Sequence, residues 1–409
     1  MQLPIKSVKQ LTFASLMLGL TLLPLQAASA AGLGDIIQTT LERRPEYRVS
    51  QSRQAVAEGF NQQSRSLLAG DTAVTLRHKN DSLGSDNGLS EWGAGLEMPL
   101  WLPGQKSSYR ELAQSLDTEA LAAHKLLAWQ VAGEVRERAW ALRLAESARD
   151  LAQEQLKAAQ ALEREVERRR NAGELADSDW ILARQETLSR RAMLQEAETG
   201  VINAHKAWET YTGLSLLPEP LSEQVEQAAD FPASHPRVLE AVSRVNRQRA
   251  ERERQRIERR ASPVLSLSAN HERGDSNLDY DNSLELSISL PLGSRSHAAP
   301  RLAEAEAALT ESEAAHQLAL IELESEAAQA RLALEQTTTA VTLAEEREGL
   351  AAKGAHLANR AFELGESDLV TLLRARNQAA DAAIDLQRKR LEHQRAIARH
   401  NQIHGVIPK

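Results

Sequence analysis

Three histidines near the C-terminus have the spacing that comes closest to metal chemistry. His393, His400 and His404 are separated by seven and four residues, so a helix would place them on one face. A histidine pair four residues apart can bind a transition metal. The alternative is an ordinary helix C-terminus, where histidine suits the negative end of the helix dipole. The helix should end near Gly405, and we favour this second interpretation.

No other pattern indicates catalysis or a bound cofactor. The sequence contains no nucleophile motif, no Gly-rich phosphate loop and no H-E-x-x-H. No basic tract dominates a face, which argues against a nucleic-acid partner. There is no cysteine, which excludes disulfides, thiolate metal sites and a lipid-modified N-terminal cysteine. We therefore expect neither an enzyme nor a cofactor.

The composition favours long helices over one thick core. Of 409 residues, 42% are hydrophobic but only 3% are aromatic, and Ala, Leu, Glu, Arg and Gln dominate. Such sequences form long helices and coiled coils. The formal net charge of -8 hints at a preference for cations. After the N-terminal segment, no apolar run is long enough to predict a membrane-spanning helix.

Residues 1–30 predict a secretory signal peptide. Lys6 and Lys9 precede an apolar stretch, Leu11–Leu25, and Ala28–Ala30 provides the small-residue cleavage site. The alternative is a membrane anchor, but the apolar stretch is interrupted and short for a span. We expect this segment to be removed.

The rest of the sequence contains the same plan twice. Ordered segments match at an offset of 191 or 192 residues, which chance similarity between Ala-rich helices does not explain. The matching pairs are Pro45 with Pro236, Leu76 with Leu267, Met98-Pro99-Leu100 with Leu290-Pro291-Leu292, and the segments that begin at Gly173 and Gly365.

Each repeat should consist of a leading helix, two strands and a long helical hairpin. The expected ranges are as follows. The first repeat covers 31–213, with a leading helix at 33–68, strands at about 72–81 and 91–100, and a hairpin at 107–213 whose tip is near 173. A Pro-rich connector covers 214–235. The second repeat covers 236–409, with a leading helix at 236–260, strands at about 263–272 and 283–292, and a hairpin at 298–404 whose tip is near 365.

The strands alternate between apolar and polar residues, which predicts a sheet with one apolar and one polar face. Pro99 and Pro291 should end strands, because proline cannot continue a ladder. Two surface hairpins of a soluble protein are an alternative, but an isolated hairpin is marginal in water. Closing several copies into a membrane barrel would remove the open edges. Trp92, Trp101 and Tyr280 could then anchor the barrel at the membrane interface.

A tight turn interrupts each long helical pattern. The 64 residues of 107–170 would rise roughly 95 Å before the first turn. Gly173 and Gly365 supply the left-handed residue that ends a helix. Ser178 and Ser367 could cap the helices that follow.

Together, these features resemble the TolC family of outer-membrane efflux channels. The signal peptide, the duplicated plan and the turn motif carry the resemblance along the whole mature chain. The motif is Gly, an acidic residue six positions later and then Ala. It is matched by Gly173, Asp179 and Ala183 and, with Thr in the acidic position, by Gly365, Thr371 and Ala375.

The resemblance implies a homotrimer in the outer membrane of a Gram-negative bacterium. Its twelve-stranded barrel would stand on a twelve-helix tunnel through the periplasm. A periplasmic adaptor would dock at the two hairpin tips, and an inner-membrane pump of the RND type would supply the cargo. Candidates for narrowing the periplasmic mouth are Asp177, Glu366, Asp368 and Arg374.

The segment PLWLPGQK, Pro99–Lys106, resembles the CzcC-like heavy-metal branch of that family. It implies passive exit of metal cations, with drugs as another cargo. Two alternatives are the exit duct of a type I protein-secretion system and a periplasmic coiled-coil adaptor or scaffold without a channel. Two complete repeats with barrel-like strands argue against the scaffold.

Overall fold

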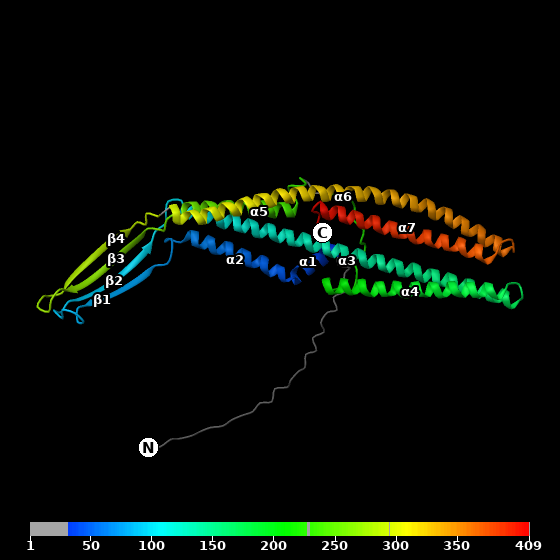
Figure 1. Ribbon diagram of the computed structural model, residues 1–409, viewed down its shortest axis with the longest axis horizontal. Coiled ribbons are helices and arrows are strands. Elements are labelled where there is room, and N and C mark those ends of the chain that lie inside the picture. Colours follow the sequence, from blue (N-terminus) through cyan, green and yellow to red (C-terminus); the bar gives the residue numbers. More distant parts are fainter. Residues whose placement is uncertain (1–31, 227–229, 294, 409) are drawn as a thin grey trace, which may run out of the picture.

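The computed structural model describes residues 32–226, 230–293 and 295–408, and the expected signal peptide lies outside them. The molecule is elongated, with a small sheet at one end and two helical-hairpin tips at the other (Figure 1). The elements are α1 (Leu33–Arg43), α2 (Pro45–Arg65), β1 (Ala73–Asn80), β2 (Ser90–Pro99), α3 (Gln105–Asn171), α4 (Asp177–Thr212), α5 (Pro236–Ile257), β3 (Val264–Arg273), β4 (Asp281–Ser289), α6 (Arg295–Glu363) and α7 (Leu369–Ile403).

The four strands form one antiparallel sheet in the order β1-β2-β3-β4. The two repeats therefore join through β2 and β3, and β1 and β4 are left as the edges of this sheet. The observed strands start and end within three residues of the expected ranges. Pro99 is the last residue of β2, whereas β4 ends at Ser289, two residues before Pro291.

The helices form a wall one helix thick. The long helices α3 and α6 have 67 and 69 residues, which at 1.5 Å per residue is roughly 100 Å each. Beside the tips the packing order is α4-α3-α7-α6, and beside the sheet it is α2-α3-α5-α6. One edge of the wall is consequently α6, and the opposite edge is α2 followed by α4 (Figure 1).

The prediction of one leading helix at 33–68 was wrong, because the chain breaks it into α1 and α2. Pro45 has no N–H and its ring excludes the helical conformation from the residue before it. Arg44 is accordingly extended, with φ -73° and ψ 135°. Pro45 then fits the first position of α2. The second leading helix, α5, ends at Ile257, three residues before the expected Arg260.

Hydrophobic residues gather in two clusters rather than in one core. The larger lies midway along the wall, where α1, α3, the end of α4 and the end of α7 meet, and it includes Trp140 and Trp208. The smaller lies near the tips and includes Val166 and Phe362. Between the clusters the helices approach through alanine-rich seams, so little apolar surface is buried there.

The connector is fastened to the larger cluster by a buried ion pair. Nε and Nη2 of Arg136 on α3 donate to the two oxygens of the Glu223 carboxylate, at 2.8 and 2.7 Å. Asn401 on α7 donates to the same carboxylate at 3.1 Å. The connector thereby holds α3 and the end of α7 together. None of the helices in the described part of the chain is both long and apolar enough to cross a membrane.

Candidate functional site

The sheet has one mainly apolar face that no other part of the described chain covers. The register aligns Leu76 with Ala94, then Ala94 with Ala269, and Ala269 with Leu284. Leu76 and Leu284 are 79% and 78% exposed. The same face carries Val74, Leu96, Met98, Leu265, Leu267, Leu286 and Ile288. An exposed apolar surface of this size is typical of a site that contacts a membrane or another protein.

The opposite face is mostly polar. Its side chains are Thr75, Arg77, Lys79, Glu91, Glu97, Ser266, Ser268, Asn270, Glu272, Asp281, Ser283, Glu285 and Ser287. Lys79 pairs with Glu91 across β1 and β2 at 3.1 Å. This face therefore suits contact with water.

Aromatic side chains mark the loop end of the apolar face. His78 stacks on Trp92 with 3.9 Å between ring centroids, and His271 stacks on Tyr280 at 4.2 Å. From Trp92 to Met98 the strand rises about 20 Å. Trp101 lies past the other end of β2, where its indole N–H donates to the Ser66 carbonyl at 3.2 Å. Two of the three expected anchors thus share one boundary of the apolar face, and the third lies beyond the opposite boundary.

Both long edges of the helical wall carry exposed apolar residues seven positions apart. On the α6 edge these are Leu343, Leu350, Leu357 and, just after the helix, Leu364. On the opposite edge they are Ile181, Leu188 and Ile202 of α4 and Val49 and Val56 of α2, with position 195 as a polar gap. Apolar residues repeated every seven positions are typical of a helix face that packs against another helix.

At the first tip, Gly173 ends α3 with φ +80°. The Glu174 N–H bonds back to the Arg169 carbonyl at 2.9 Å, as in a Schellman turn. The prediction that Ser178 caps α4 was wrong. The N-cap is Ala176, and the Asp179 carboxylate accepts its N–H at 3.1 Å. Because α4 already starts at Asp177, Ser178 lies inside the helix.

At the second tip, Gly365 ends the turn with φ +75°. The prediction that Ser367 caps α7 was also wrong, because Asp368 occupies the N-cap and its carboxylate accepts the Thr371 N–H at 2.8 Å. Hydrogen bonding from Thr371 lowers the pKa of Asp368, and the Arg374 charge adds to the effect.

Each tip therefore uses one half of a capping box. In the first tip the carboxylate at the third helical position, Asp179, reaches back to the cap N–H. In the second tip the carboxylate at the cap, Asp368, reaches forward to the third position. This exchange explains in physical terms why Thr371 stands where the motif expects an acid.

The other predicted tip residues have different surroundings and do not form one cluster. Asp177 is exposed, and its carboxylate lies 3.8 Å from the Arg170 guanidinium. Glu366 is exposed, and its N–H bonds to the Ala361 carbonyl at 2.9 Å. Ala183 is buried in the smaller hydrophobic cluster, so its position in the motif is explained by packing.

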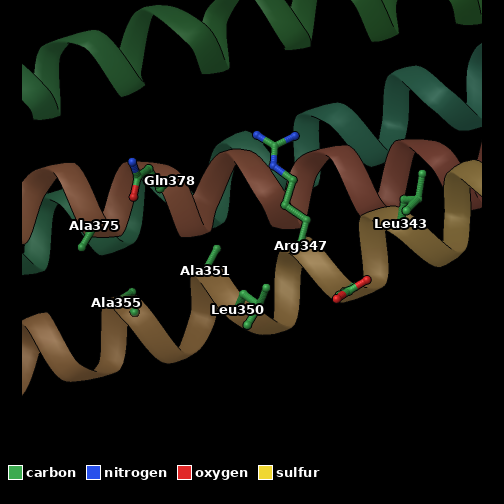
Figure 2. Close-up of a pocket in the computed structure, with 9 residues that line it drawn as sticks. Leu343, Arg347, Leu350, Ala351, Ala355, Ala375 and Gln378 are labelled. Atoms are coloured by element: carbon green, nitrogen blue, oxygen red, sulfur yellow. The ribbon is translucent and has the colours of Figure 1, made fainter.

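Ala375 lines a groove of about 600 Å³ between α6 and α7. Figure 2 shows Ala351 and Ala355 of α6 beside Ala375 of α7, with Leu350 at the rim. The other residues along it are Leu343, Glu346, Arg347, Gly354 and Gln378. Sequence reasoning identified only Ala375 in this groove. The pattern that could have indicated the other groove residues is the leucine at every seventh position of α6, next to small residues.

The structure does not bring the three candidate histidines to one metal site. His393 lies 3.2 Å from the Thr337 hydroxyl on α6. His400 and His404 stack on each other at 4.1 Å and are buried. Within the described ranges, no group of three or more His, Asp or Glu residues is arranged to hold a metal ion.

No protein-family model and no curated protein matches the sequence. Solved structures do match. The outer membrane protein VceC of Vibrio cholerae has a TM-score of 0.75 at 14% identity, over 91% of this chain and 96% of that chain. The chain has the fold of these outer-membrane proteins. The MtrE outer membrane channel of Neisseria gonorrhoeae in its open state gives 0.71 at 19% identity, over 92% of this chain and 89% of that one.

The CmeC outer membrane channel of Campylobacter jejuni gives a TM-score of 0.69 at 15% identity, over 98% of this chain and 94% of that chain. These matches span both repeats. They confirm the predicted fold of the single chain, which is mainly helical with a small antiparallel sheet.

Proposed function

We propose that three copies of this chain form a passive channel that crosses the outer membrane and continues as a tunnel through the periplasm. The observation that carries this proposal is the pair of open edges on one wall. The first edge is β1, α2 and α4, and the second is β4 and α6. Each edge has an unpaired strand in the sheet and, along its helices, exposed apolar residues at every seventh position. These features fit the opposite edge of another copy.

Joining unlike edges gives a head-to-tail arrangement, which closes into a ring when the rotation between copies divides a full turn. The sheet supports three copies over two. Two copies of a four-stranded sheet would give an eight-stranded barrel, whose interior side chains fill. Three copies give twelve strands and a water-filled lumen. The polar face would line this lumen, and the apolar face, about 20 Å from Trp92 to Met98, would meet lipid.

The helical part extends the same duct roughly 100 Å from the membrane. We place a periplasmic adaptor at the tips around Gly173 and Gly365, with the groove at Ala375 as a seat for a partner helix. An inner-membrane pump of the RND type would then deliver cargo to the duct. Passage needs no bound group, because diffusion through a wet, polar lumen is sufficient.

For cargo we favour heavy-metal cations, on the resemblance of Pro99–Lys106 to the CzcC-like branch. Export of drugs or, through a type I secretion system, of proteins is the alternative. Deleting the gene and measuring tolerance to zinc, cobalt, cadmium and several drugs separates these cargoes. Unchanged metal tolerance would exclude the metal branch while leaving the channel itself in place.

The channel is tested with the full-length protein expressed in its host. We expect it in the outer-membrane fraction, as an oligomer on an unheated denaturing gel that converts to monomer on heating. In planar lipid bilayers the purified oligomer should give stable single-channel conductance. A soluble periplasmic monomer without conductance would instead support the coiled-coil scaffold.

A further inference from the structure

The beginning and end of each repeat meet at a junction, and the duplication makes the two junctions comparable. We call Arg43, Arg44, Trp208, Thr212 and Gly213 the first junction, and His235, His400, His404 and Gly405 the second junction. At an offset of 191 or 192 residues, Arg44 corresponds to His235, Trp208 to His400, Thr212 to His404 and Gly213 to Gly405. Both glycines are left-handed, with φ +75° and +79°.

The first junction is held by groups that do not titrate near neutral pH. The Arg43 guanidinium donates to the Thr212 carbonyl at 2.8 Å. The Arg44 guanidinium lies 5.1 Å from the ring centroid of Tyr211. Trp208 is completely buried beneath them. Arginine remains charged at every physiological pH, so this junction is insensitive to acid.

The second junction places imidazole rings at the equivalent positions. His235 is 0% exposed, and its Nδ1 accepts the Arg237 N–H at 3.1 Å, so its proton is on Nε2. The ring lies edge-on to Trp129, 4.9 Å between centroids. His404 Nδ1–H donates to the His400 carbonyl at 2.8 Å. The acceptor role of His235 Nδ1 requires a neutral ring.

A second proton on His235 would have no acceptor in this junction. His235 Nε2 and His400 Nδ1 have no hydrogen-bond partner among the described residues. Protonation of His235 Nδ1 would turn the acceptor that caps α5 into a donor facing another N–H. A Cβ at Gly405 would lie 3.1 Å from the His235 ring, so the ring also packs directly on the chain end.

The charges around the second junction oppose protonation. Burial lowers the pKa of His235 to about 4, assisted by the Arg237 charge and by His404. Burial likewise lowers the pKa of His400. Of the nearby charged groups, Arg237 on α5 is paired with Glu326 on α6 at 3.0 Å.

The other charged groups near the second junction are either paired or exposed to solvent. On α3, Arg136 is paired with Glu223 of the connector at 2.7 Å. Asp230, in the loop before α5, is exposed to solvent. No carboxylate in the described contacts is therefore positioned to stabilise an imidazolium at His235.

We propose that the second junction is an acid-sensitive clamp, in which protonation of His235 and His400 releases the end of α7 and the start of α5 from α3. The first junction stays closed under the same conditions. A histidine with a depressed pKa in the folded state costs no stability above its unfolded value of about 6.5. Stability is lost as the pH falls from there toward 4. The clamp is independent of the proposed channel, since its opening is a local property of the chain.

Hydrogen exchange measured by mass spectrometry on the full-length protein tests the clamp. Rates at pH 7.5 and pH 5.0 are divided by the intrinsic exchange rates. We expect protection of 399–406 and 236–241 to fall about tenfold or more at pH 5.0, as a shift of one pKa unit or more requires. Protection of 44–49 and 206–213 should not change. Equal changes at both junctions, or none at either, would overturn the proposal.

A substitution separates titration from packing. His235→Asn keeps an oxygen that can cap α5 but removes the titrating group, so the acid response should shrink. His393→Asn, on α7 but outside the junction, is the control and should respond as the parent does. If the His235→Asn variant already has a loosened junction at pH 7.5, the His400→Phe variant is tested in its place. A full acid response in the variant that stays closed at pH 7.5 contradicts the clamp.

Discussion

Leu96 on β2 pairs with Leu267 on β3, so the two repeats meet across a leucine pair on the bare face of the sheet. The next residue along β3, Ser268, pairs with Gly95 and lies on the polar face. Adjacent positions of one strand thus have opposite surroundings, and they provide matched substitutions.

Leu267→Arg should impair insertion of the sheet into the outer membrane. An arginine on a lipid-facing position near the midplane costs about 2–4 kcal/mol, whereas one on the lumen side costs little. Ser268→Arg is the control and should still yield the heat-sensitive oligomer at normal levels. Gel analysis of outer-membrane fractions gives both results. Equal loss in the two variants would mean that the faces are not lipid and water.

Leu350→Glu combined with Leu357→Glu should prevent trimer formation. Both side chains are exposed on the α6 edge and belong to its sevenfold series, so carboxylates there would be buried without partners between copies. Glu348→Lys changes the charge of a partly exposed residue outside that series and serves as the control. Native mass spectrometry in detergent measures the oligomer. A trimer in the double variant would remove α6 from the proposed interface.

Asp368→Ala should loosen the start of α7, because the Thr371 N–H loses its acceptor. Adding Thr371→Asp supplies the carboxylate from the other end of the capping box, as Asp179 does in the first tip, and should restore the helix start. Hydrogen exchange of 369–373 follows both changes. Asp177→Ala, which removes an exposed carboxylate 3.8 Å from Arg170, is the control and should change little.

The same cap has a defined pH dependence. The pKa of Asp368 is lowered in the folded chain, so its contribution is complete above the unfolded value of about 3.9. It disappears as the pH falls through the folded pKa. The parent and Asp368→Ala should therefore exchange 369–373 alike in strong acid and differ at neutral pH. A difference that persists in strong acid would show that the carboxylate does not act through this cap.

Arg136→Met should destabilise the middle of the molecule by about 3 kcal/mol, because it leaves the Glu223 carboxylate without its ion-pair partner. Glu223→Gln in the same chain should recover much of the loss, since the uncompensated charge is then gone. Thermal unfolding followed by circular dichroism measures both. A double variant no more stable than the single one would assign the effect to lost packing of the arginine.

Local patterns in the sequence predicted much of the fold. Alternation in segments such as Leu284–Ile288 and glycines such as Gly173 and Gly365 depend on neighbours in the chain, so strands and turns could be predicted to within a few residues. The helix caps could not, because serine at 178 or 367 is a good cap only if the backbone begins the helix there.

Other features depend on contacts between distant segments. The break before Pro45 was overlooked because the surrounding pattern is helical on both sides. The meeting of His235 with His404 joins residues at opposite ends of the second repeat, which no spacing rule connects. The groove at Ala375 likewise arises only when α6 and α7 pack together.

The separation of Trp208 from Phe362, one in each hydrophobic cluster, has a consequence for how the chain melts. Two small apolar centres on a rod roughly 100 Å long cannot enforce a single all-or-none transition. In calorimetry an isolated subunit should lose order near the tips and around the middle at different temperatures. Only assembly into a ring, which joins neighbouring walls along their whole length, would merge these steps into one cooperative event.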